Sequence, residues 1–593
     1  MTVNNPFTIV SPEKLDASTA EQLFVEVFSD FPQVRNPGHS MIIGSRGSGK
    51  SMMFRCLLPD VLKIKEGRTF ADLEFFAFHV PIKNTQLKIT ELSKLDNNHA
   101  SFLINEHFLV LTVVIHVLNA LIAFPSTDLP FNEPEYKEFI ESIYLRRLRL
   151  CGCKTECEFR KTSSKVFFQA LRDQMEDMHA DFFTYIREIS YESDISAPPY
   201  NLPLLSYLGF VVPFFQGLSK LPGFPKKNIY LFIDDADNLS KTQTQILNSW
   251  LSTRTQPEIS LKVSAQIGKY KSYVSQNGTL VESPHDYQEV NISDRYTTSQ
   301  TAYYNRVSEI LEKRLNLAGI KNITPEMYFP PYDKQELAVK EEGKRLRANW
   351  EKEGRGHRPG DDVLRYARPN YIRNLGGTRK ARSTYRYAGL NHLVHLSSGI
   401  IRYVLDSAAS MFDQTVKDKE MSQALQFIPD NIQDAIARDK ADGMLFFQFQ
   451  KLEKDEDVLT GELGTVQKLQ NLVFSMGHTF HEILLSDRSE RRVFSFALSN
   501  RPTSDIQDVL NFGVQTGYLH MATIGNKEGT GRTWLYIMNR CLAPHFILDP
   551  TGFAGYLFVT NDNLLSAMNR GTFLRDLKSL DEPEQLTLFE GRI

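Results

Sequence analysis

Few features of this sequence point to export, to a disulfide framework or to a strongly charged partner. Its 593 residues contain only 5 cysteines, and residues 1–12 carry neither the basic nor the apolar segment of a secretory signal. We therefore expect a reduced, cytoplasmic environment. The formal net charge is only -3, which excludes a globally basic surface. Any contact with nucleic acid must then come from a local patch.

The chain also lacks a convincing membrane-spanning run. Residues 108–124 carry no formal charge over 17 residues, which is at the short limit for a span. Thr112, His116 and Asn119 recur there at helical spacing and form a polar stripe. A second apolar stretch, 204–218, is interrupted by Pro213. We predict buried core helices and no transmembrane segment.

Three of the cysteines, Cys151, Cys153 and Cys157, lie close together in the sequence. A structural metal site would need a fourth ligand. No histidine or cysteine follows Cys157 within 20 residues. Reduced thiols in a helical region are the favoured interpretation, with a metal site as the alternative.

The strongest motif lies at 41–51, Met-Ile-Ile-Gly-Ser-Arg-Gly-Ser-Gly-Lys-Ser, which satisfies G-x-x-x-x-G-K-[ST]. Its glycines let backbone N–H groups turn toward a polyphosphate. Lys50 brings a positive charge to the outer phosphates, and the Ser51 hydroxyl is a ligand for Mg²⁺. A helix following from about 51 to 58 would direct its positive end at the same anion. We expect an ATP site formed by Gly44, Ser45, Arg46, Gly47, Ser48, Gly49, Lys50 and Ser51.

A second landmark is Ile-Tyr-Leu-Phe-Ile-Asp-Asp-Ala-Asp at 229–237. Five apolar residues predict a central parallel strand, and ligands of open α/β sheets sit where such strands end. Asp234 is placed to hold Mg²⁺, and Asp235 to orient the attacking water. The next predicted strand, 259–267, ends in the polar residues Ser264 and Gln266. Either could sense the γ-phosphate, and we favour Gln266.

The remaining pattern divides the chain into five parts. We predict an N-terminal helical arm at 1–37, amphipathic over 20–31, and a P-loop ATPase domain at 38–300 with a helical insertion at 85–226. A helical lid at 301–445, a winged-helix domain at 446–560 and a tail at 561–593 follow. Strands are also expected at 74–81 and 288–292, and helices at 304–317 and 335–350.

The clearest basic patch lies at 365–386, where seven cations alternate with tyrosines and no acid intervenes. Cations neutralise phosphates, and aromatic rings stack on bases. The patch could equally be a solvated face or a surface for an acidic protein. Its candidate nucleic-acid contacts are Arg373, Arg379, Lys380, Arg382 and Arg386.

The winged-helix prediction rests on helices at 466–485 and 503–516, strands at 518–524 and 533–538, and a wing at 525–532. Lys527 and Arg532 are its best phosphate contacts. The predicted recognition helix carries Asp505 and Asp508 and no lysine or arginine. Protein–protein contact is therefore as well supported as DNA binding.

The tail holds the last signal. After the acidic residues 581–584 come Gln585, Leu586, Leu588 and Phe589. This order resembles the short peptide by which many bacterial proteins dock on the replicative sliding clamp. Such a peptide places a glutamine and an apolar pair into preformed pockets. The alternative is a tail strand that packs on its own domain.

Taken together, the P-loop, the Ile-Asp-Asp-Ala-Asp sequence, the polar strand tip and the downstream helices resemble the AAA+ superfamily. Gly399 and Arg402, in Leu-Ser-Ser-Gly-Ile-Ile-Arg at 396–402, resemble its second sensor, which implies that Arg402 contacts the γ-phosphate. The order with a later winged helix is similar to origin-recognition-type ATPases and to related bacterial ATPases suspected of roles in phage defence. The resemblance implies an α/β fold, a parallel P-loop sheet with a helical insertion, a helical lid and a C-terminal winged helix.

Two departures from this family pattern shape the expected activity. Asp235 stands where many relatives carry glutamate, and its shorter side chain should position water less well, so we expect slow hydrolysis. No arginine lies between Arg254 and Arg295, the window in which ring-forming relatives carry an arginine finger. Both departures favour a nucleotide-controlled switch over an efficient ring motor.

We therefore expect an ATP- and Mg²⁺-dependent switch that engages DNA or a DNA-bound complex. Replication proteins, the sliding clamp or further copies of the chain are the expected partners. The alternative is a signalling ATPase of an anti-phage defence system that controls a partner effector. A third reading is an ATP-binding scaffold that does not hydrolyse.

Overall fold

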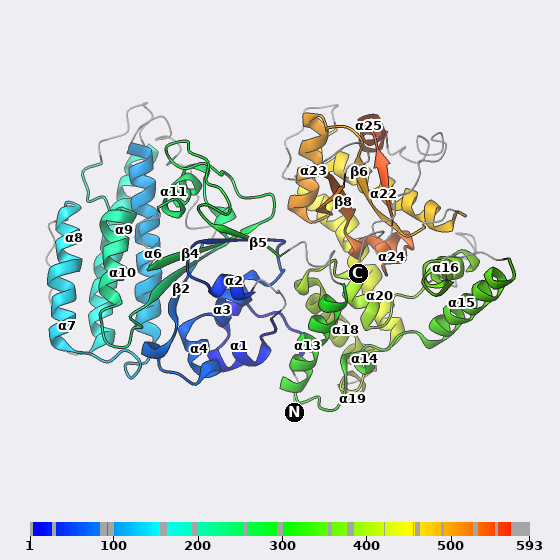
Figure 1. Cartoon of the computed structure of the whole chain (residues 1–593), viewed down its shortest axis with the longest axis horizontal. Helices are drawn as coiled ribbons and strands as arrows, with labels where there is room; N and C mark the ends of the chain where they lie inside the picture. Colours follow the sequence, from blue (N-terminus) through cyan, green and yellow to red (C-terminus); the bar gives the residue numbers. More distant parts are fainter. Residues whose placement is uncertain are drawn as a thin grey trace. The chain divides into compact units, whose positions relative to one another are not determined.

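The computed structural model divides the chain into two compact units (Figure 1). The ATPase unit comprises Val10–Ile292, and the C-terminal unit comprises Met1–Ile9 together with Ser293–Ile593. The residues that the structure describes are 4–26, 31–82, 92, 100–153, 163–191, 200–253, 258–292, 300–353, 359–375, 385–419, 421–454, 456, 463–487, 491–525, 532–551 and 555–570.

The ATPase unit is built on a five-stranded sheet in the order β2-β3-β4-β1-β5. All its pairings are parallel, so the carboxyl ends of the strands share one edge. Strand β4 separates the P-loop strand β1 from the acid-bearing strand β3. The predicted strands are confirmed as β1 (Ser40–Gly44), β2 (Phe75–Pro81), β3 (Asn228–Asp234), β4 (Ile259–Gln266) and β5 (Gln288–Asn291).

Aromatic side chains stack on one face of this sheet. The ring of Phe54, on helix α3 (Lys50–Cys56), stacks on Phe232 with centroids 4.6 Å apart. Phe75 and Tyr230 stack at 4.3 Å. Every residue from Ile229 to Asp234 is buried, as expected for a parallel strand that is covered on both faces. This packing fixes the strand ends that carry the polar side chains.

Helices of the predicted insertion cover one flank of the sheet. Helices α6 (Ala100–Ala123) and α9 (Ser164–Tyr191) run side by side (Figure 1). By length and composition alone α6 could cross a membrane. However, Phe108 of α6 stacks on Phe182 of α9 with centroids 4.8 Å apart, and α6 contributes Leu111, Val114 and Leu118 to the core of the unit. It is the predicted core helix.

The shorter elements of this unit surround the long pair and the sheet. Cys151, the first residue after α8, is a free thiol, Cys153 is buried, and Cys157 lies outside the described residues. The elements are α4 (Pro59–Glu66), η2 (Phe70–Asp72), α7 (Glu133–Glu138), η4 (Phe139–Tyr144), α8 (Leu145–Leu150), η5 (Tyr207–Val211), α10 (Val212–Leu218), η6 (Ala236–Asn238) and α11 (Lys241–Leu251).

The N-terminal residues are divided between the two units. Elements η1 (Pro12–Lys14), α1 (Ala17–Leu23) and α2 (Phe31–Arg35) belong to the ATPase unit. The predicted arm contains these short helices, but no helix continues through the amphipathic residues 20–31, because α1 ends at Leu23, Phe24 is extended and Pro32 lies in the first turn of α2. Phe7 is fully buried in the C-terminal unit, with its ring 5.8 Å from that of Tyr328.

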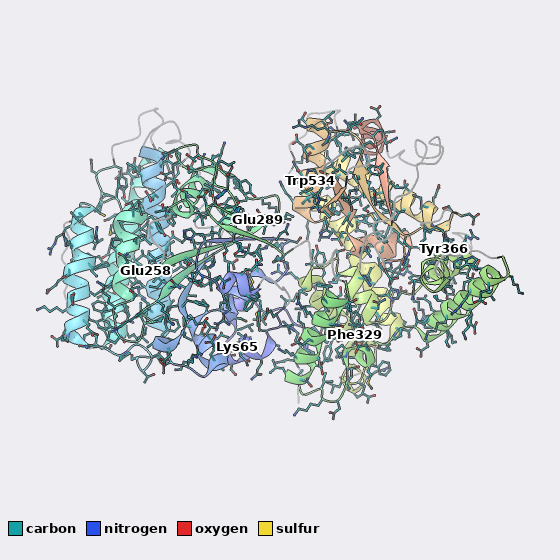
Figure 2. All side chains as sticks on the ribbon, in the orientation of Figure 1. Lys65, Glu258, Glu289, Phe329, Tyr366 and Trp534 are labelled. Carbon is teal, nitrogen blue, oxygen red and sulfur yellow. The ribbon has the colours of Figure 1, made fainter. Side chains whose placement is uncertain are left out.

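The C-terminal unit begins with helices. The predicted helices at 304–317 and 335–350 are confirmed as α13 and α15. Helix α15 packs against α16, where the ring centroids of Trp350 and Tyr366 lie 5.4 Å apart; Figure 2 labels Tyr366. The helices are α13 (Gln300–Leu317), α14 (Pro325–Tyr328), α15 (Asp333–Glu353), α16 (Pro359–Asn374), α17 (Leu390–Leu396), α18 (Ile401–Lys419), α19 (Met421–Ala424), α20 (Asp430–Asp442), η8 (Gly443–Gln448) and α21 (Phe449–Lys454).

A four-stranded sheet in the order β7-β8-β6-β9 follows. The predicted helices at 466–485 and 503–516 are present as α22 (Thr465–Leu485) and α23 (Ser504–Thr516). The two predicted strands are β7 (Leu519–Gly525) and β8 (Arg532–Met538). Two strands were not anticipated, β6 (Val493–Leu498) and β9 (Gly555–Val559). Elements η9 (Arg540–Leu542), α24 (Ala543–Phe546) and α25 (Asn561–Arg570) complete the unit.

Candidate nucleotide site

The P-loop has the backbone that its glycines predict. Gly47 and Gly49 have φ of 84° and 108°, a region that side chains with a Cβ rarely adopt. Gly44 is required for a different reason, because a Cβ there would lie 2.3 Å from Cγ1 of Ile292. The three glycines therefore shape a loop whose backbone can approach a phosphate closely.

Lys50 opens helix α3 directly after this loop and is only 6% exposed. Its ammonium donates hydrogen bonds to the carbonyl oxygens of Gly44, at 2.8 Å, and Ser45, at 3.1 Å. Two backbone carbonyl oxygens of the loop thus hold the cation. Phosphate oxygens can replace them as stronger, charge-assisted acceptors.

Asp234 is the centre of a buried polar network at the end of β3. It is 1% exposed and accepts a hydrogen bond from the Ser264 hydroxyl on the neighbouring strand. Nε2 of His79, on β2, lies 3.2 Å from its second carboxylate oxygen. Burial disfavours the charged carboxylate, but the interactions with His79, Ser264 and Ser51 hold the pKa of Asp234 below its ordinary value. It is therefore a carboxylate at neutral pH.

Asp235 faces solvent one residue further on. Its φ of 57° is left-handed, which is uncommon for a non-glycine residue. The backbone N–H of Asp235 donates to the Ser264 hydroxyl at 3.0 Å and to Asp234 at 3.1 Å. Desolvation at the sheet edge, and then the charge of Asp234, raise the pKa of Asp235 to about 6. A carboxylate with that pKa is well matched to accept or orient a proton near neutral pH.

The residues present fit a nucleotide with Mg²⁺. Ser51 is among the groups that lower the pKa of Asp234, so the two oxygen ligands predicted for the ion are near one another, and hard cations prefer such oxygens. The Ser48 hydroxyl, within the loop, is buried and has no hydrogen-bond partner among the described residues. A buried orphan donor in an anion-binding loop is the group that a phosphate oxygen would satisfy.

Gln266 lies at the same edge, at the tip of β4. It is paired in register with Gly44, and its backbone N–H donates to Asp237 at 2.9 Å. The structure therefore brings Gln266 beside the P-loop. Arg402, in contrast, belongs to the C-terminal unit, where it is exposed in the first turn of α18. Its contact with the γ-phosphate stays a prediction.

The described cations of the basic patch are paired with acids from other elements. Arg373 contacts Asp487 at 2.5 Å, and Arg386 contacts Asp430 and lies over the ring of Tyr332 at 4.2 Å. Because these acids are remote in sequence, the sequence alone showed no negative charge beside the patch. Arg379, Lys380 and Arg382 lie outside the described residues.

Of the two phosphate contacts predicted on the wing, Arg532 is the one that the structure describes. Arg532 opens strand β8 and contacts the Thr523 hydroxyl at 3.4 Å. Trp534, two residues later, is half exposed (Figure 2). Lys527 and residues 571–593 of the tail, with Gln585, Leu586, Leu588 and Phe589, lie outside the described residues.

Two residues of the site were not recognised as such from the sequence. His79 stands at the carboxyl end of a predicted strand, and that position was the signal that could have identified it. Ser264 was considered only as a phosphate sensor, whereas its hydroxyl binds the Asp234 carboxylate. Both act through partners on neighbouring strands, which only the strand order reveals.

Comparison with known proteins identifies the family of the chain. The ORC-CDC6-like family model matches residues 5–558. None of the curated proteins matches the chain. Among solved structures, Cdc6p from Pyrobaculum aerophilum matches with 11% identity over 95% of this chain and 97% of that chain. Its TM-score of 0.29 is too low to add to the fold described above. Because the family model covers nearly the whole chain, this protein belongs to the ORC-CDC6-like family, an origin-recognition type of AAA+ ATPase.

Proposed function

We propose that this protein is an ATP-controlled switch that engages DNA or a DNA-bound complex. The observation that carries the proposal is the edge at which Lys50, Ser51, Asp234 and Asp235 meet. That edge has a cation, two hard oxygen ligands and a carboxylate with a pKa near neutral. It supplies what nucleotide binding and hydrolysis need. Membership in the ORC-CDC6-like family supports DNA-related machinery as the partner.

Each residue has a distinct part in this proposal. The bound ion would neutralise phosphate charge, and Ser51 and Asp234 would hold it. Lys50 binds the outer phosphates, and Asp235 orients water for attack. The left-handed backbone of Asp235 aims a side chain one methylene shorter than glutamate. We expect slow turnover, so that the ATP-bound state persists long enough to act as a signal.

Arg402 is proposed to report the γ-phosphate to the C-terminal unit. Arg402→Ala should keep the affinity for ADP and weaken that for ATP, because only ATP carries the proposed partner group. Equilibrium titration with fluorescent ADP and with a non-hydrolysable ATP analogue separates the two. An equal loss for both nucleotides would make Arg402 a structural residue.

The test of the switch is nucleotide-dependent DNA binding by the full chain. Fluorescence anisotropy with labelled duplex DNA should give different affinities in saturating ATP and ADP. Lys50→Ala should behave the same in both. Wild-type protein that binds DNA equally with ATP, with ADP and without nucleotide would refute the proposal.

The second candidate is a signalling ATPase of a defence system that acts on an effector protein. It is favoured by one observation, the acidic character of α23. Asp505 pairs with Lys468 at 3.1 Å, and no cation on this helix faces outward for a DNA phosphate because its sequence contains none. Capture of a protein partner in ATP but not ADP, with no DNA affinity in either, would establish this alternative.

A further inference from the structure

Three potential metal ligands converge beside the nucleotide edge from three separate elements. They are Glu13 of η1, His79 of β2 and Asp234 at the end of β3, with ligand atoms all within 4.8 Å of one another. Nε2 of His79 lies 3.2 Å from Oδ2 of Asp234. Adjacent ligands of a bound divalent ion are separated by about 3 Å when metal–ligand bonds are about 2.1 Å. A small rotation of the exposed Glu13 side chain would complete such a set.

The two inner ligands are held by their surroundings. Asp234 is 1% exposed and is oriented by the Ser264 hydroxyl. The side chain of His79 is 13% exposed, and its ring packs 6.4 Å from that of Phe54. Their mutual geometry is therefore preorganised, which lowers the cost of ordering ligands around an ion.

The third ligand is delivered by an anchored segment. The guanidinium of Arg55, on α3, donates to the carbonyl oxygen of Leu15 at 3.2 and 3.0 Å. Arg55 is itself fixed by two hydrogen bonds to Asp60, at 2.9 and 2.8 Å. Because Leu15 directly follows η1, these bonds hold Glu13 at the side of the helix that carries Ser51.

There is room for an ion with its water. A cavity of about 280 Å³ is lined by Glu13, Ser51 and His79, with apolar walls from Ala120 and Phe124 of the insertion. One water occupies about 30 Å³ in the liquid, so the cavity could hold several. The cavity borders Glu13 and His79, so water could complete the coordination sphere of an ion on that side.

We propose that Glu13, His79 and Asp234 form a divalent-cation site that takes Mn²⁺ in preference to Mg²⁺. Two carboxylates alone would suit Mg²⁺, whereas an imidazole nitrogen favours transition metals. The site shares Asp234 with the proposed function but requires no nucleotide. An ion here would join η1 to the nucleotide edge, so that the N-terminal segment is fixed against the strands that bear the acids.

The test uses the full chain without nucleotide and Mn²⁺ alone as the probe. Electron paramagnetic resonance of free Mn²⁺ should show one ion bound per chain. His79→Gln and Glu13→Gln should each weaken Mn²⁺ binding at least tenfold, because removing even an outer partner of a metal ligand costs about 10–100-fold. Bound Mn²⁺ should also resist a tenfold excess of Mg²⁺ in the wild type, and His79→Gln should lose this preference.

Glu74→Gln is the matched control, because Glu74 is an exposed acid that precedes the other end of β2. It should bind Mn²⁺ as the wild type does. Glu13 is exposed, so Glu13→Gln tests the site without endangering the fold. No Mn²⁺ binding by the wild type, or unchanged affinity in both ligand variants, would overturn the proposal. A His79 that only pairs with Asp234 and binds no metal would give one of these two outcomes.

Lys50→Ala separates this site from the proposed function. That variant should lose ATP and keep Mn²⁺, since the lysine is not among the three ligands. If it keeps both, the nucleotide assignment fails while the metal site stands. If wild type and Lys50→Ala both fail to bind Mn²⁺ while ATP binding follows Lys50, the metal site alone fails.

Discussion

The ammonium of Lys50 donates a hydrogen bond to the carbonyl oxygen of Gly44, six residues earlier, at 2.8 Å. The bond spans the P-loop and holds the cation where a phosphate would replace the carbonyl. Because Lys50 is nearly buried, its charge meets little competing solvent. That arrangement gives the first prediction.

Lys50→Ala should weaken ATP binding by about 10–100-fold or more, because a charge-assisted hydrogen bond contributes about 1.5–3 kcal/mol. Isothermal titration calorimetry with ATP and Mg²⁺ measures the change. Lys241→Ala, an exposed lysine at the start of α11, should bind as the wild type does. Equal ATP affinity in wild type and Lys50→Ala would remove the nucleotide assignment.

Asp235→Asn should keep ATP binding and lose hydrolysis. Because the pKa of Asp235 is raised to about 6, the residue is ionised at pH 7 and becomes protonated as the pH falls. The kcat/KM of the wild type should therefore fall about tenfold per pH unit below pH 6. The residual kcat/KM of Asp235→Asn should not fall in this way below pH 6. If kcat/KM falls at the same pH in both proteins, the titrating group is not Asp235.

Ser264→Ala should lower the stability of the ATPase unit by about 1–3 kcal/mol, since a buried carboxylate loses a donor. The pKa of Asp234 is depressed in the folded state, so this contribution is present above its unfolded value of 3.8 and is lost as the pH falls further. Thermal unfolding should show the full difference at pH 7 and a smaller one in acid. Ser252→Ala, at an exposed helix end, is the control and should have no such effect.

Reversing Arg379, Lys380 and Arg382 to glutamate should abolish DNA binding and flatten its salt dependence. These three are the better targets because Arg373 and Arg386 are engaged with acids in the fold. Reversing Lys527 and Arg532 should cost less affinity. Anisotropy with duplex DNA at several salt concentrations measures both. The opposite ranking would place the DNA site on the wing.

A peptide of residues 581–593 should bind the bacterial sliding clamp with micromolar affinity. Burying Leu588 and Phe589 in pockets could supply about 1.5–3 kcal/mol per side chain before ordering costs. Anisotropy of the labelled peptide against purified clamp provides the measurement, with a Leu588→Ala, Phe589→Ala peptide as the control. Binding by neither peptide, or by both equally, would exclude this partner.

The sequence by itself determined the parts of this protein whose chemistry is local. The P-loop needs eleven consecutive residues, 41–51, and its glycine spacing already fixes the backbone that a phosphate requires. The apolar run before Asp234 likewise predicted β3, because a buried parallel strand has a continuous apolar pattern. The amphipathic spacing over 20–31 did not predict where the helix stops, because the spacing continues beyond Leu23, at which α1 ends.

Only the tertiary structure decided which remote residues share the site. The strand order puts β2 and β4 on either side of β3, which brings His79 and Ser264 to Asp234 across separations of 155 and 30 residues. The tertiary structure also places Asp487 against Arg373. The basic patch therefore has an acid beside it in space, although its own sequence contains none. Electrostatic and hydrogen-bond partners are set by distance in space, and the chain pattern specifies which strands form but not which lie next to one another.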